Sequence, residues 1–419
     1  ELYRKPRTPR KLTFSSTERR ILQMATDNMQ YVKKDLPGKV LNIGMAFLAI
    51  GLIVGAFGFI MDPVRAKFSY LLGFFFILTI GVGSLFIIAL EYVANADWST
   101  PMRRIPEFFG SSVPLFFLIA VPLFFFMHDL FHWTHTEAVE TDKLLKGKEP
   151  YLNITFFIIR VLVTFAVWSL YYFFVVKNSR KQDETKDQKL TKKNVVASAI
   201  FIPLFAITLT FAGIDWMMSL EPHWFSTIYG VYVFAGTLLA GLAATTLAVI
   251  LLKENGYMHP RMHNDSLASL GGLMFGFINF WAYIAFSQFM LIWYANLPEE
   301  TFWFIRRWEG WWASITLTLI VVHFLVPYAL LLPAPAKKDP KRLKFAAVWI
   351  LVAHLIDLYW LIMPQYHGEK SGLLYVVTEF GFPVAAIGGL IIVFYFNFKK
   401  HNAVPIGDPK LERGLNNRP

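Results

Sequence analysis

Long apolar segments alternate with short polar segments along the whole chain. Ten of the apolar segments are roughly 20 residues or longer, and a helix of that length crosses the ~30 Å hydrocarbon layer of a bilayer. They lie near residues 38 to 60, 68 to 90, 109 to 127, 154 to 176, 195 to 218, 227 to 252, 268 to 294, 308 to 332, 344 to 363 and 374 to 398. A backbone in lipid must satisfy its own hydrogen bonds, which uninterrupted apolar runs do as helices. The pattern predicts an all-α membrane protein with ten transmembrane helices.

The polar segments divide the chain into a membrane domain and flanking pieces. Residues 1–37 are polar and basic, Thr13-Phe-Ser-Ser-Thr-Glu-Arg-Arg predicts a short capped helix on the membrane surface, and no signal peptide is expected. Residues 38–398 form the predicted transmembrane domain, and residues 399–419 form a polar tail. The segment 177–194 is densely charged and lacks apolar periodicity, so it predicts a mobile cytoplasmic loop between four helices and six.

Basic residues gather on one side of the predicted membrane domain. The composition, 55% hydrophobic and 16% charged, fits no soluble class. Of the 40 Lys and Arg residues, 31 fall in the terminal segments and in the loops after even-numbered helices, 8 fall in the other loops, and Arg160 lies inside the fourth helix. The positive-inside rule therefore predicts that both termini are cytoplasmic. The net charge of +11 is explained by orientation in a membrane, so nucleic-acid binding is not expected.

The chain contains no cysteine. Disulfides, thiolate-ligated iron–sulfur clusters, cysteine-anchored haem and cysteine catalysis are therefore excluded as features of this chain, and cofactors of these kinds would belong to a partner. No phosphate-binding glycine loop, serine-hydrolase elbow or glycosidase carboxylate pair is recognised. The sequence thus predicts no catalytic set of its own.

A few ionisable residues stand inside the apolar segments. Each costs roughly 2.5 to 3.5 kcal/mol on membrane-insertion scales, so each is a functional candidate. They are Arg160 in the fourth helix, Asp215 near the outer end of the fifth, His323 in the eighth, His354 and Asp357 in the ninth, Glu379 near the outer end of the tenth, and Glu91 at the cytoplasmic end of the second. Arg160 is expected to neutralise Asp215 or Glu379, and it cannot donate a proton because a guanidinium stays charged.

His354 and Asp357 are three residues apart, so they share one face of the ninth helix. Such a pair can pass a proton. The alternative is a satisfied polar pair that fixes helix packing, since polar contacts also hold membrane helices together. Both interpretations remain open from the sequence.

The buried polar residues predict two half-channels that meet near His354. Depth along the helices assigns them to an outer or an inner half. The outer half comprises Asp357, Asp215, Glu379, Glu221 and His223, the inner half comprises His323 and Glu91, and Ser287 and Gln288 of the seventh helix are hydrogen-bonding links. Such a series suits proton transfer across a membrane.

Three histidines follow one another at the outer end of the third helix. His128, His132 and His135 stand at i, i+4 and i+7, which predicts one helical stripe and includes a spacing seen in metal sites. Clustered polar side chains at a hydrated helix end are commoner than metal sites, and no HExxH order is present, so these residues are only weak metal candidates. Haem ligation by His323 and His354 is disfavoured as well.

Two kinds of residue suggest contact surfaces. Small residues at helical spacing, Gly51 with Gly55 and Gly272 with Gly276, predict close helix packing within this chain. Nine of the 13 tryptophans fall at or near outer helix ends or in outer loops. This bias suits both an aromatic belt in lipid and a docking surface for an external partner.

Two stretches carry a resemblance to a known family. The run from Phe211 to Gly236, which contains Asp215-Trp-Met-Met-Ser-Leu-Glu221-Pro-His223-Trp, closely resembles the membrane subunits of alternative complex III, which are of the NrfD or polysulfide-reductase type. The later run Asn279-Phe-Trp-Ala-Tyr-Ile-Ala-Phe-Ser-Gln and the opening Thr13-Phe-Ser-Ser resemble the ActF subunit of that complex. The resemblance extends over essentially the whole chain and is most specific in helices five to eight.

The resemblance implies an NrfD-like helical bundle in the bacterial inner (cytoplasmic) membrane. It implies an integral subunit of a quinol:cytochrome c oxidoreductase that anchors the complex and provides a proton route, with quinone or menaquinone as a further ligand. Expected partners are a second NrfD-like subunit (ActC), an iron–sulfur subunit (ActB), multihaem cytochromes c and a terminal oxidase, with haem and iron–sulfur clusters on those partners. Redox chemistry is thus assigned to partner subunits.

Two alternatives to this function stay open. One is a stand-alone secondary transporter whose buried charges bind a substrate or a coupling ion. The absence of paired mid-helix breaks argues against it, since Pro203 and Pro327 are isolated. The other is a pure structural anchor, in which neutral replacements at Arg160, His354 and Asp357 alter assembly only.

Overall fold

The computed structural model describes residues 30–368 and 372–417 of the 419-residue chain. The surface helix expected at Thr13 lies outside the described residues. Within them, every regular element is helical, and ten spans are long and apolar enough to cross a membrane. The prediction of an all-α protein with ten membrane-spanning helices is confirmed at that level.

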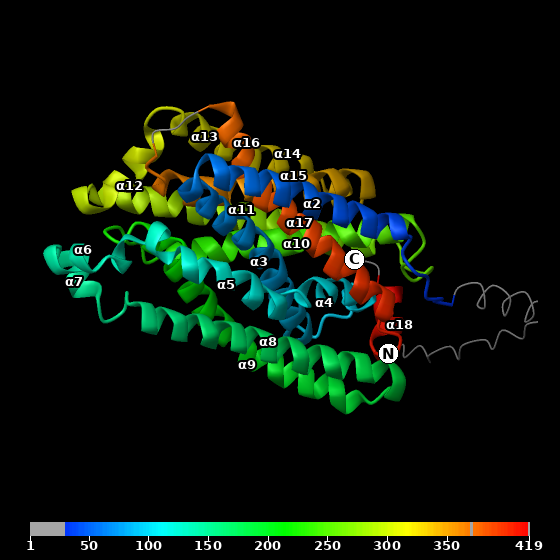
Figure 1. The fold of residues 1–419 in the computed structure, drawn as a ribbon. Helices are drawn as coiled ribbons and strands as arrows, with labels where there is room; N and C mark the ends of the chain where they lie inside the picture. Colours follow the sequence, from blue (N-terminus) through cyan, green and yellow to red (C-terminus); the bar gives the residue numbers. More distant parts are fainter. Residues whose placement is uncertain (1–29, 369–371, 418–419) are drawn as a thin grey trace, which may run out of the picture.

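The ten spans follow the predicted segments in order (Figure 1). They are α2 (Gly38–Met61), α3 (Pro63–Val93), α4 (Arg104–Gly110) with α5 (Val113–Leu130), α8 (Ile154–Thr185), α9 (Gln188–Trp216), α10 (Tyr229–Glu254), α11 (Ser266–Ala295), α13 (Trp312–Leu319) with α14 (Val326–Leu331), α15 (Pro340–Ile362), and α16 (Leu373–Glu379) with α17 (Gly381–Lys400). Shorter helices are α6 (Thr136–Thr141), α7 (Lys143–Lys148), α12 (Pro298–Trp308) and α18 (Leu411–Asn416).

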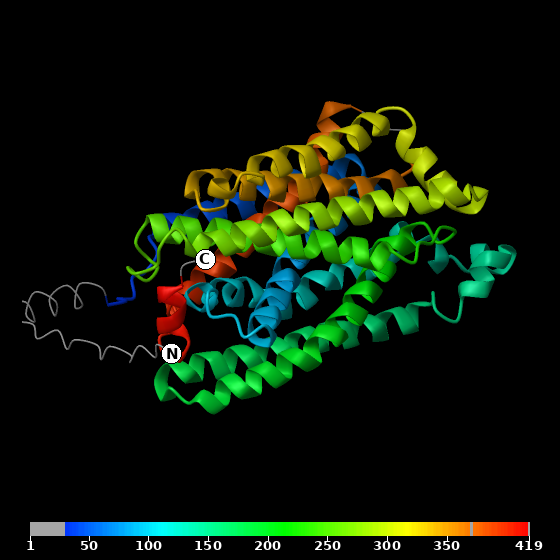
Figure 2. The same cartoon turned by 180° about the vertical axis from the view of Figure 1, so that it is seen from behind.

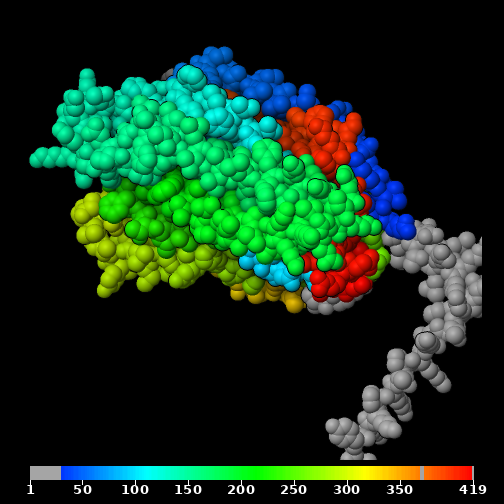
Figure 3. Space-filling view, turned by 90° about the horizontal axis from the view of Figure 1, so that it is seen from below, coloured from blue at the N-terminus to red at the C-terminus, as the bar shows by residue number. Residues whose placement is uncertain are grey.

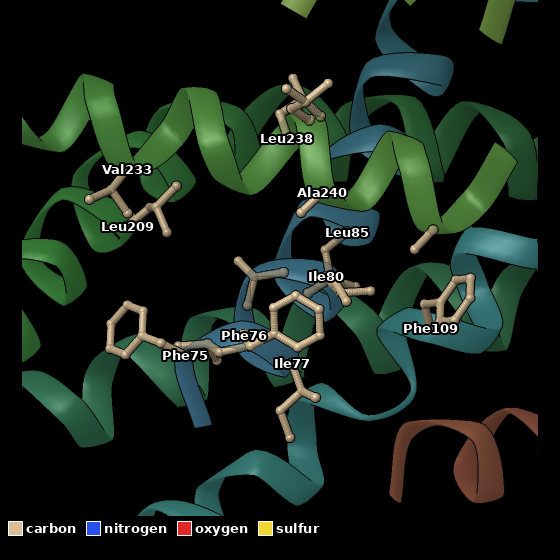
Figure 4. Packing of buried hydrophobic residues seen from close by; sticks show 14 of the residues in the cluster. Phe75, Phe76, Ile77, Ile80, Leu85, Phe109, Leu209, Val233, Leu238 and Ala240 are labelled. Carbon is tan, nitrogen blue, oxygen red and sulfur yellow. The ribbon is translucent and has the colours of Figure 1, made fainter. Parts of the chain in front are cut away.

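Helices α3 and α10 form the centre of the bundle, and most of their residues are buried. Glycines allow their backbones to approach closely: a Cβ added to Gly83 would lie 2.3 Å from the carbonyl oxygen of Thr237. Around this contact, large apolar side chains of α3 such as Phe75 and Ile80 fill the space toward neighbouring helices (Figure 4). A helix that is buried on all sides has apolar residues on every face. These two spans therefore show little amphipathic pattern in the sequence.

The predicted glycine contacts divide into two cases. Gly51 packs against α17, because a Cβ there would lie 2.1 Å from the amide nitrogen of Ala385. Gly272 and Gly276 of α11 have no atom of the described chain within 4 Å of an added Cβ. The expectation that this second pair packs within the chain is therefore wrong, because the small residues lie on the face of α11 that faces away from the bundle.

The bundle has two ends of different character. We name the end where α2 begins and α17 ends the basic end; there Lys33 Nζ donates to the carbonyl oxygen of Lys399 at 2.7 Å, and Figure 3 shows the start of α2 and the C-terminal residues gathered on this side. We name the opposite end, formed by the connections 131–153, 217–228 and 363–368, the vestibule end.

The segment 177–194 was expected to be a mobile loop and is helical instead. Helix α8 continues to Thr185, and α9 begins after a turn in which Lys186 has a φ of 53° and Asp187 caps α9. Figures 1 and 2 show the two long helices side by side along one flank. The inward face is polar but bonded, as in the 2.7 Å bond from Gln182 Nε2 to Thr191 Oγ1. Apolar periodicity cannot detect a helix whose buried face is polar.

Candidate functional site

Three ionisable side chains from two neighbouring spans meet inside the bundle. His354 and Asp357 come from α15, and His323 comes from a π-helical segment, Ile320–Leu325, between α13 and α14. One potential ligand atom of each residue lies within 4.8 Å of the others, and all three side chains are almost fully buried. We name these residues the central cluster. The structure thus brings His323 to the predicted pair on α15.

Local geometry explains this meeting. A spacing of three residues places His354 and Asp357 on one face of α15. The π-helical turn re-aims the side chain of His323, as such turns often do at functional sites. Trp281 of α11 stacks on the His323 ring, with a centroid separation of 3.7 Å and an interplanar angle of 20°.

The carboxylate of Asp357 is bound by neutral donors. Tyr232 of α10 donates its hydroxyl to Oδ1 at 2.5 Å, and Trp281 donates Nε1–H to Oδ2 at 3.2 Å. Among the described residues, no Lys or Arg nitrogen lies within ion-pair distance of this carboxylate. Asp357 can therefore gain or lose a proton without stranding a cationic partner.

His354 has one nitrogen bound and one open. Its Nε2 lies 2.9 Å from Thr79 Oγ1, and the single hydroxyl hydrogen of Thr79 is donated to the carbonyl oxygen of Phe76 at 2.9 Å. When Thr79 donates to Phe76 O it accepts from His354, an arrangement that places the hydrogen of His354 on Nε2 and leaves Nδ1 as a bare acceptor.

Nδ1 of His354 and both ring nitrogens of His323 are buried and have no hydrogen-bond partner among the described residues. An unsatisfied buried polar group costs about 1–3 kcal/mol. Two histidines with open nitrogens beside one carboxyl group are an arrangement that can accept and release a proton.

A polar pocket of about 600 Å³ opens at the vestibule end. Five of the chain's ten histidines line it: His128, His132, His135, His223 and His367. The pocket, which we name the histidine vestibule, also contains Glu221 and Arg306, which form an ion pair at 2.8 Å. His223 Nε2 lies 2.5 Å from Asp142 Oδ2, and this bond lowers the pKa of the Asp142 carboxyl.

The three histidines predicted as one stripe do not form one. Helix α5 ends at Leu130 and a 3₁₀ turn covers His132–Thr134, so the α-helical spacing is lost. The rings of His128 and His135 stack at 3.8 Å, and His135 Nε2 bonds the carbonyl oxygen of His128 at 2.8 Å. Their ligating atoms are not among the described groups close enough to share a metal.

Glu379 lies between the bundle interior and the histidine vestibule. It ends α16 and accepts a 2.6 Å hydrogen bond from the Tyr359 hydroxyl, while Arg65 Nε lies 3.5 Å from its other oxygen. The guanidinium of Arg65 also lies over the ring of Tyr366, which lines the vestibule and bonds Asp62. These contacts link a buried acid to the polar pocket.

Arg160 forms an ion pair with Asp215, one of its two predicted partners. Its Nε and Nη2 approach the carboxylate at 2.8–3.1 Å, and the Tyr151 hydroxyl donates to the same group at 3.1 Å. The guanidinium also lies 3.8 Å from the centre of the Tyr151 ring. Asp215 is thus held in a tight ion pair on α8 and α9.

Glu91 belongs to an ion network at the basic end. Arg103 bridges Glu91 at 3.3 Å and Asp408 of the C-terminal tail at 2.5 Å, and all three side chains are buried. The tail is anchored further by the bond from Gly407 N to Asp183 Oδ1 at 3.2 Å. The tail therefore covers the position of Glu91.

Among the described residues, no hydrogen bond joins the two polar residues expected as links on α11 to the central cluster. Gln288 is buried and accepts a long 3.5 Å hydrogen bond from the Ser226 hydroxyl, and Ser287 is half-buried. Sequence reasoning missed the real neighbours of the cluster, which are Thr79, Tyr232 and Trp281. Thr79 interrupts a run of Phe, Ile and Leu, and that isolated hydroxyl was the available signal.

One described pocket fits only part of a quinone. An apolar pocket of about 280 Å³ lies between α2, α3, α5 and α17, with Phe74, Phe116 and Phe382 among its lining. This lining suits an isoprenoid or acyl chain. Its two hydroxyl donors are already engaged, since Tyr70 donates to Ile119 O at 2.8 Å and Ser112 to Phe109 O at 2.5 Å. The pocket therefore suits a lipid tail better than a quinone headgroup.

Comparison of the sequence with models of known protein families finds no match, and comparison with curated proteins finds none either. The function is therefore argued from the residues and the site.

Proposed function

We propose that this chain is an ActF-type membrane subunit of a bacterial quinol:cytochrome c oxidoreductase and that it provides a proton route through the central cluster. The family assignment is carried by the runs around Asp215 and Asn279 described above. In this proposal the chain anchors an ActC-like subunit, an iron–sulfur ActB-like subunit and multihaem cytochromes c in the inner membrane, alongside a terminal oxidase. Those partners carry the haem and iron–sulfur groups, and quinol is oxidised on them.

The observation that carries the proton route is the central cluster. His323, His354 and Asp357 come together inside a membrane-spanning bundle with three open imidazole nitrogens. Ionisable groups in such a position are costly, and they occur in membrane proteins mainly in ion and proton pathways. Asp357 has no cationic partner in the part of the chain that the structure describes, which leaves its charge free to change.

Buried polar groups extend the proposed route toward both ends of the bundle. On α10, the hydroxyls of Thr237, Thr245 and Thr246 are buried and have no hydrogen-bond partner among the described residues. All three lie beyond Tyr232 along α10, in the direction of the basic end. The positive-inside rule assigns that end to the cytoplasm. Toward the other end, Glu379 and its neighbour Arg65 lead to the histidine vestibule.

The membership of a respiratory complex is tested by purification. The chain is tagged and isolated in mild detergent, and a dithionite-reduced minus oxidised visible spectrum is recorded. We expect strong c-type haem bands from co-purified partners. A flat spectrum from a stable, isolated chain would overturn the assignment to a quinol-oxidising complex.

The proton route is tested by two matched substitutions. In the complex reconstituted in liposomes, Asp357→Asn is expected to lower proton translocation per quinol oxidised by at least about tenfold, because a positioned acid or base contributes that much or more. Asp215→Asn is the control, since Asp215 is held by Arg160 outside the cluster. It is expected to reduce assembly while complexes that do form translocate protons normally. Normal translocation by Asp357→Asn would exclude the route.

A secondary transporter remains a second candidate, favoured by two helix discontinuities. One span contains the π-helical segment Ile320–Leu325, and another is interrupted at Phe380 between α16 and α17, directly after Glu379. Broken helices often form binding sites in transporters. Solute uptake by the isolated chain in liposomes, together with the absence of haem partners, would favour this function.

A further inference from the structure

We propose that one water molecule is bound beside Gly236, between His323, His354 and Asp357, and that it completes the hydrogen bonding of the central cluster. Its location is argued from the geometry of the described residues. Its role as a carrier of protons rests on the proposed function.

The open nitrogens of the cluster require a neighbouring group that both donates and accepts hydrogen bonds. Nδ1 of His354 is a bare acceptor, because Thr79 holds the hydrogen on Nε2. A neutral His323 has one N–H donor and one acceptor, and both are open and buried. A water can accept from His323 while it donates to His354 Nδ1 and to Asp357. Buried waters of this kind make about three such bonds.

Gly236 of α10 lies beside the open nitrogen and the carboxylate. A Cβ built on this glycine would have His354 Cε1 at 3.2 Å and Nδ1 at 3.3 Å as its nearest atoms, followed by Asp357 Oδ2 at 3.8 Å. The absence of a side chain therefore lets the His354 ring pack closely against α10. A methyl group at this position would press against the ring at its open nitrogen, so this glycine is suited to a site where Nδ1 must stay accessible to a small bound group.

The separations within the cluster leave space for a bridging water. The ligand atoms lie within 4.8 Å of one another, yet the cluster residues share no direct hydrogen bond. Two atoms bonded at ~2.8 Å to one water at a near-tetrahedral angle stand about 4.6 Å apart, which is within this limit. One water can therefore reach all three residues.

Charge favours a water over a metal ion. The central cluster contains a single carboxyl group and two imidazoles, so a divalent cation would leave a net positive charge in the hydrocarbon interior. Isolated charges there are strongly disfavoured. A water adds no charge, and it lets Asp357 and His354 exchange one proton: the water gives a proton to Nδ1 and takes one from the carboxyl group. Atoms and charge balance because one proton enters and one leaves the water.

The location is tested first on the unsubstituted protein. A high-resolution cryo-electron microscopy map of the purified complex is examined beside Gly236, and its metal content is measured by mass spectrometry. We expect density for one atom within hydrogen-bond distance of His354 Nδ1 and of Asp357, and no stoichiometric transition metal. The absence of such density, or a metal bound at one per chain, would overturn the proposal.

The role is tested with Gly236→Ala, which crowds the His354 ring at its open nitrogen and removes no polar group. Gly272→Ala is the matched control, because it makes the same change in a membrane span where an added Cβ has no atom of the described residues within 4 Å. Gly236→Ala is expected to lower proton translocation at least about tenfold while quinol oxidation continues, and Gly272→Ala to leave both unchanged. Wild-type translocation by Gly236→Ala would overturn the role of the water.

The bound water and the proton route can be excluded separately. If Asp357→Asn blocks translocation and Gly236→Ala does not, the proton route stands and the bound water is wrong. If neither substitution affects translocation, the proton route itself is wrong. Should Gly236→Ala fail to assemble, the map of the unsubstituted complex still decides whether the water is present.

Discussion

Two acids of this protein are equally buried and are held in opposite ways. Asp215 is 2% exposed and Asp357 is 1% exposed, and both belong to long apolar helices. Asp215 is bound by the guanidinium of Arg160, whereas Asp357 is bound by the hydroxyl of Tyr232 and the indole of Trp281. Depth in the membrane therefore does not define the role of a carboxyl group. The charge of its partners does.

This difference separates a structural function from a chemical one. Protonation of Asp215 would leave Arg160 buried and unpaired, which is strongly unfavourable. Protonation of Asp357 strands no charge, and the open nitrogens of His323 and His354 lie nearby to receive or supply the proton. We therefore expect the pair Arg160–Asp215 to hold α8 against α9 and the central cluster to carry the chemistry.

The largest effect is expected when the ion pair is broken from the cationic side. Arg160→Met leaves Asp215 buried without its cation and should destabilise the protein by about 3–5 kcal/mol. Thermal unfolding of the purified protein in detergent measures this change. Arg306→Met is the control, because its pair with Glu221 is partly exposed and should contribute only about 0.2–1 kcal/mol. Equal effects of the two substitutions would contradict the comparison.

A smaller loss of stability is expected at the second acid. Asp357→Asn keeps the side-chain shape and one acceptor, and loses about one hydrogen bond, so we expect a change of about 1 kcal/mol. The same unfolding assay applies. A loss as large as that of Arg160→Met would show that Asp357 is part of an essential structural network.

The tautomer of neutral His354 provides a further test, because it depends on one hydrogen-bond partner. Thr79→Val removes the acceptor that holds hydrogen on Nε2, so the two neutral tautomers should become mixed, with a stability change of about 1 kcal/mol or less. Solid-state ¹⁵N NMR of histidine-labelled protein in lipid reports the tautomer. Thr79→Ser retains the hydroxyl and should retain the Nε2–H form. An unchanged spectrum in Thr79→Val would show that another group sets the tautomer.

The smallest effect is expected at His401, a titratable group outside the membrane whose charge state also depends on the charge of its neighbours. Burial lowers the pKa of His401 to about 4, and the nearby positive charges of Arg180 and Arg104 act in the same direction. The folded state therefore holds His401 neutral, and its contribution to stability is present above the ordinary pKa of 6.5 and is lost as the pH falls toward 4.

Acidification from pH 7.5 to 5 should loosen the C-terminal tail next to His401. Hydrogen exchange of residues 403–416, corrected for the intrinsic effect of pH, measures this change. His401→Asn should flatten the dependence on pH, because the group that gains a proton is gone. An unaltered dependence in that variant would assign the effect to other residues.

The membrane spans could be predicted closely because their signal is local. Ten apolar runs each satisfy their own backbone, and the structure places helices at all ten. The helical hairpin around Lys186 could not be predicted in this way, because its stability comes from polar contacts such as Asn194 to Tyr92, 102 residues apart in the chain.

The candidate site was predictable in part for a related reason. His354 and Asp357 share a helix face, which follows from their spacing alone. That His323 joins them depends on a π-helical turn, and that Arg160 selects Asp215 over Glu379 depends on how α8 packs against α9. The close approach of His354 to Gly236 could not be inferred at all, since it depends on how α10 packs against α15.

The bridge between Arg103 and the C-terminal tail has a consequence for biosynthesis. Arg103 is buried near the second span, but Asp408 emerges from the ribosome only after all ten spans. Until then, the guanidinium has Glu91 as its acidic partner and lacks the lid formed by the tail. The ion network at the basic end is therefore completed last, and a nascent chain that stops before Asp408 leaves Arg103 without its second acidic partner.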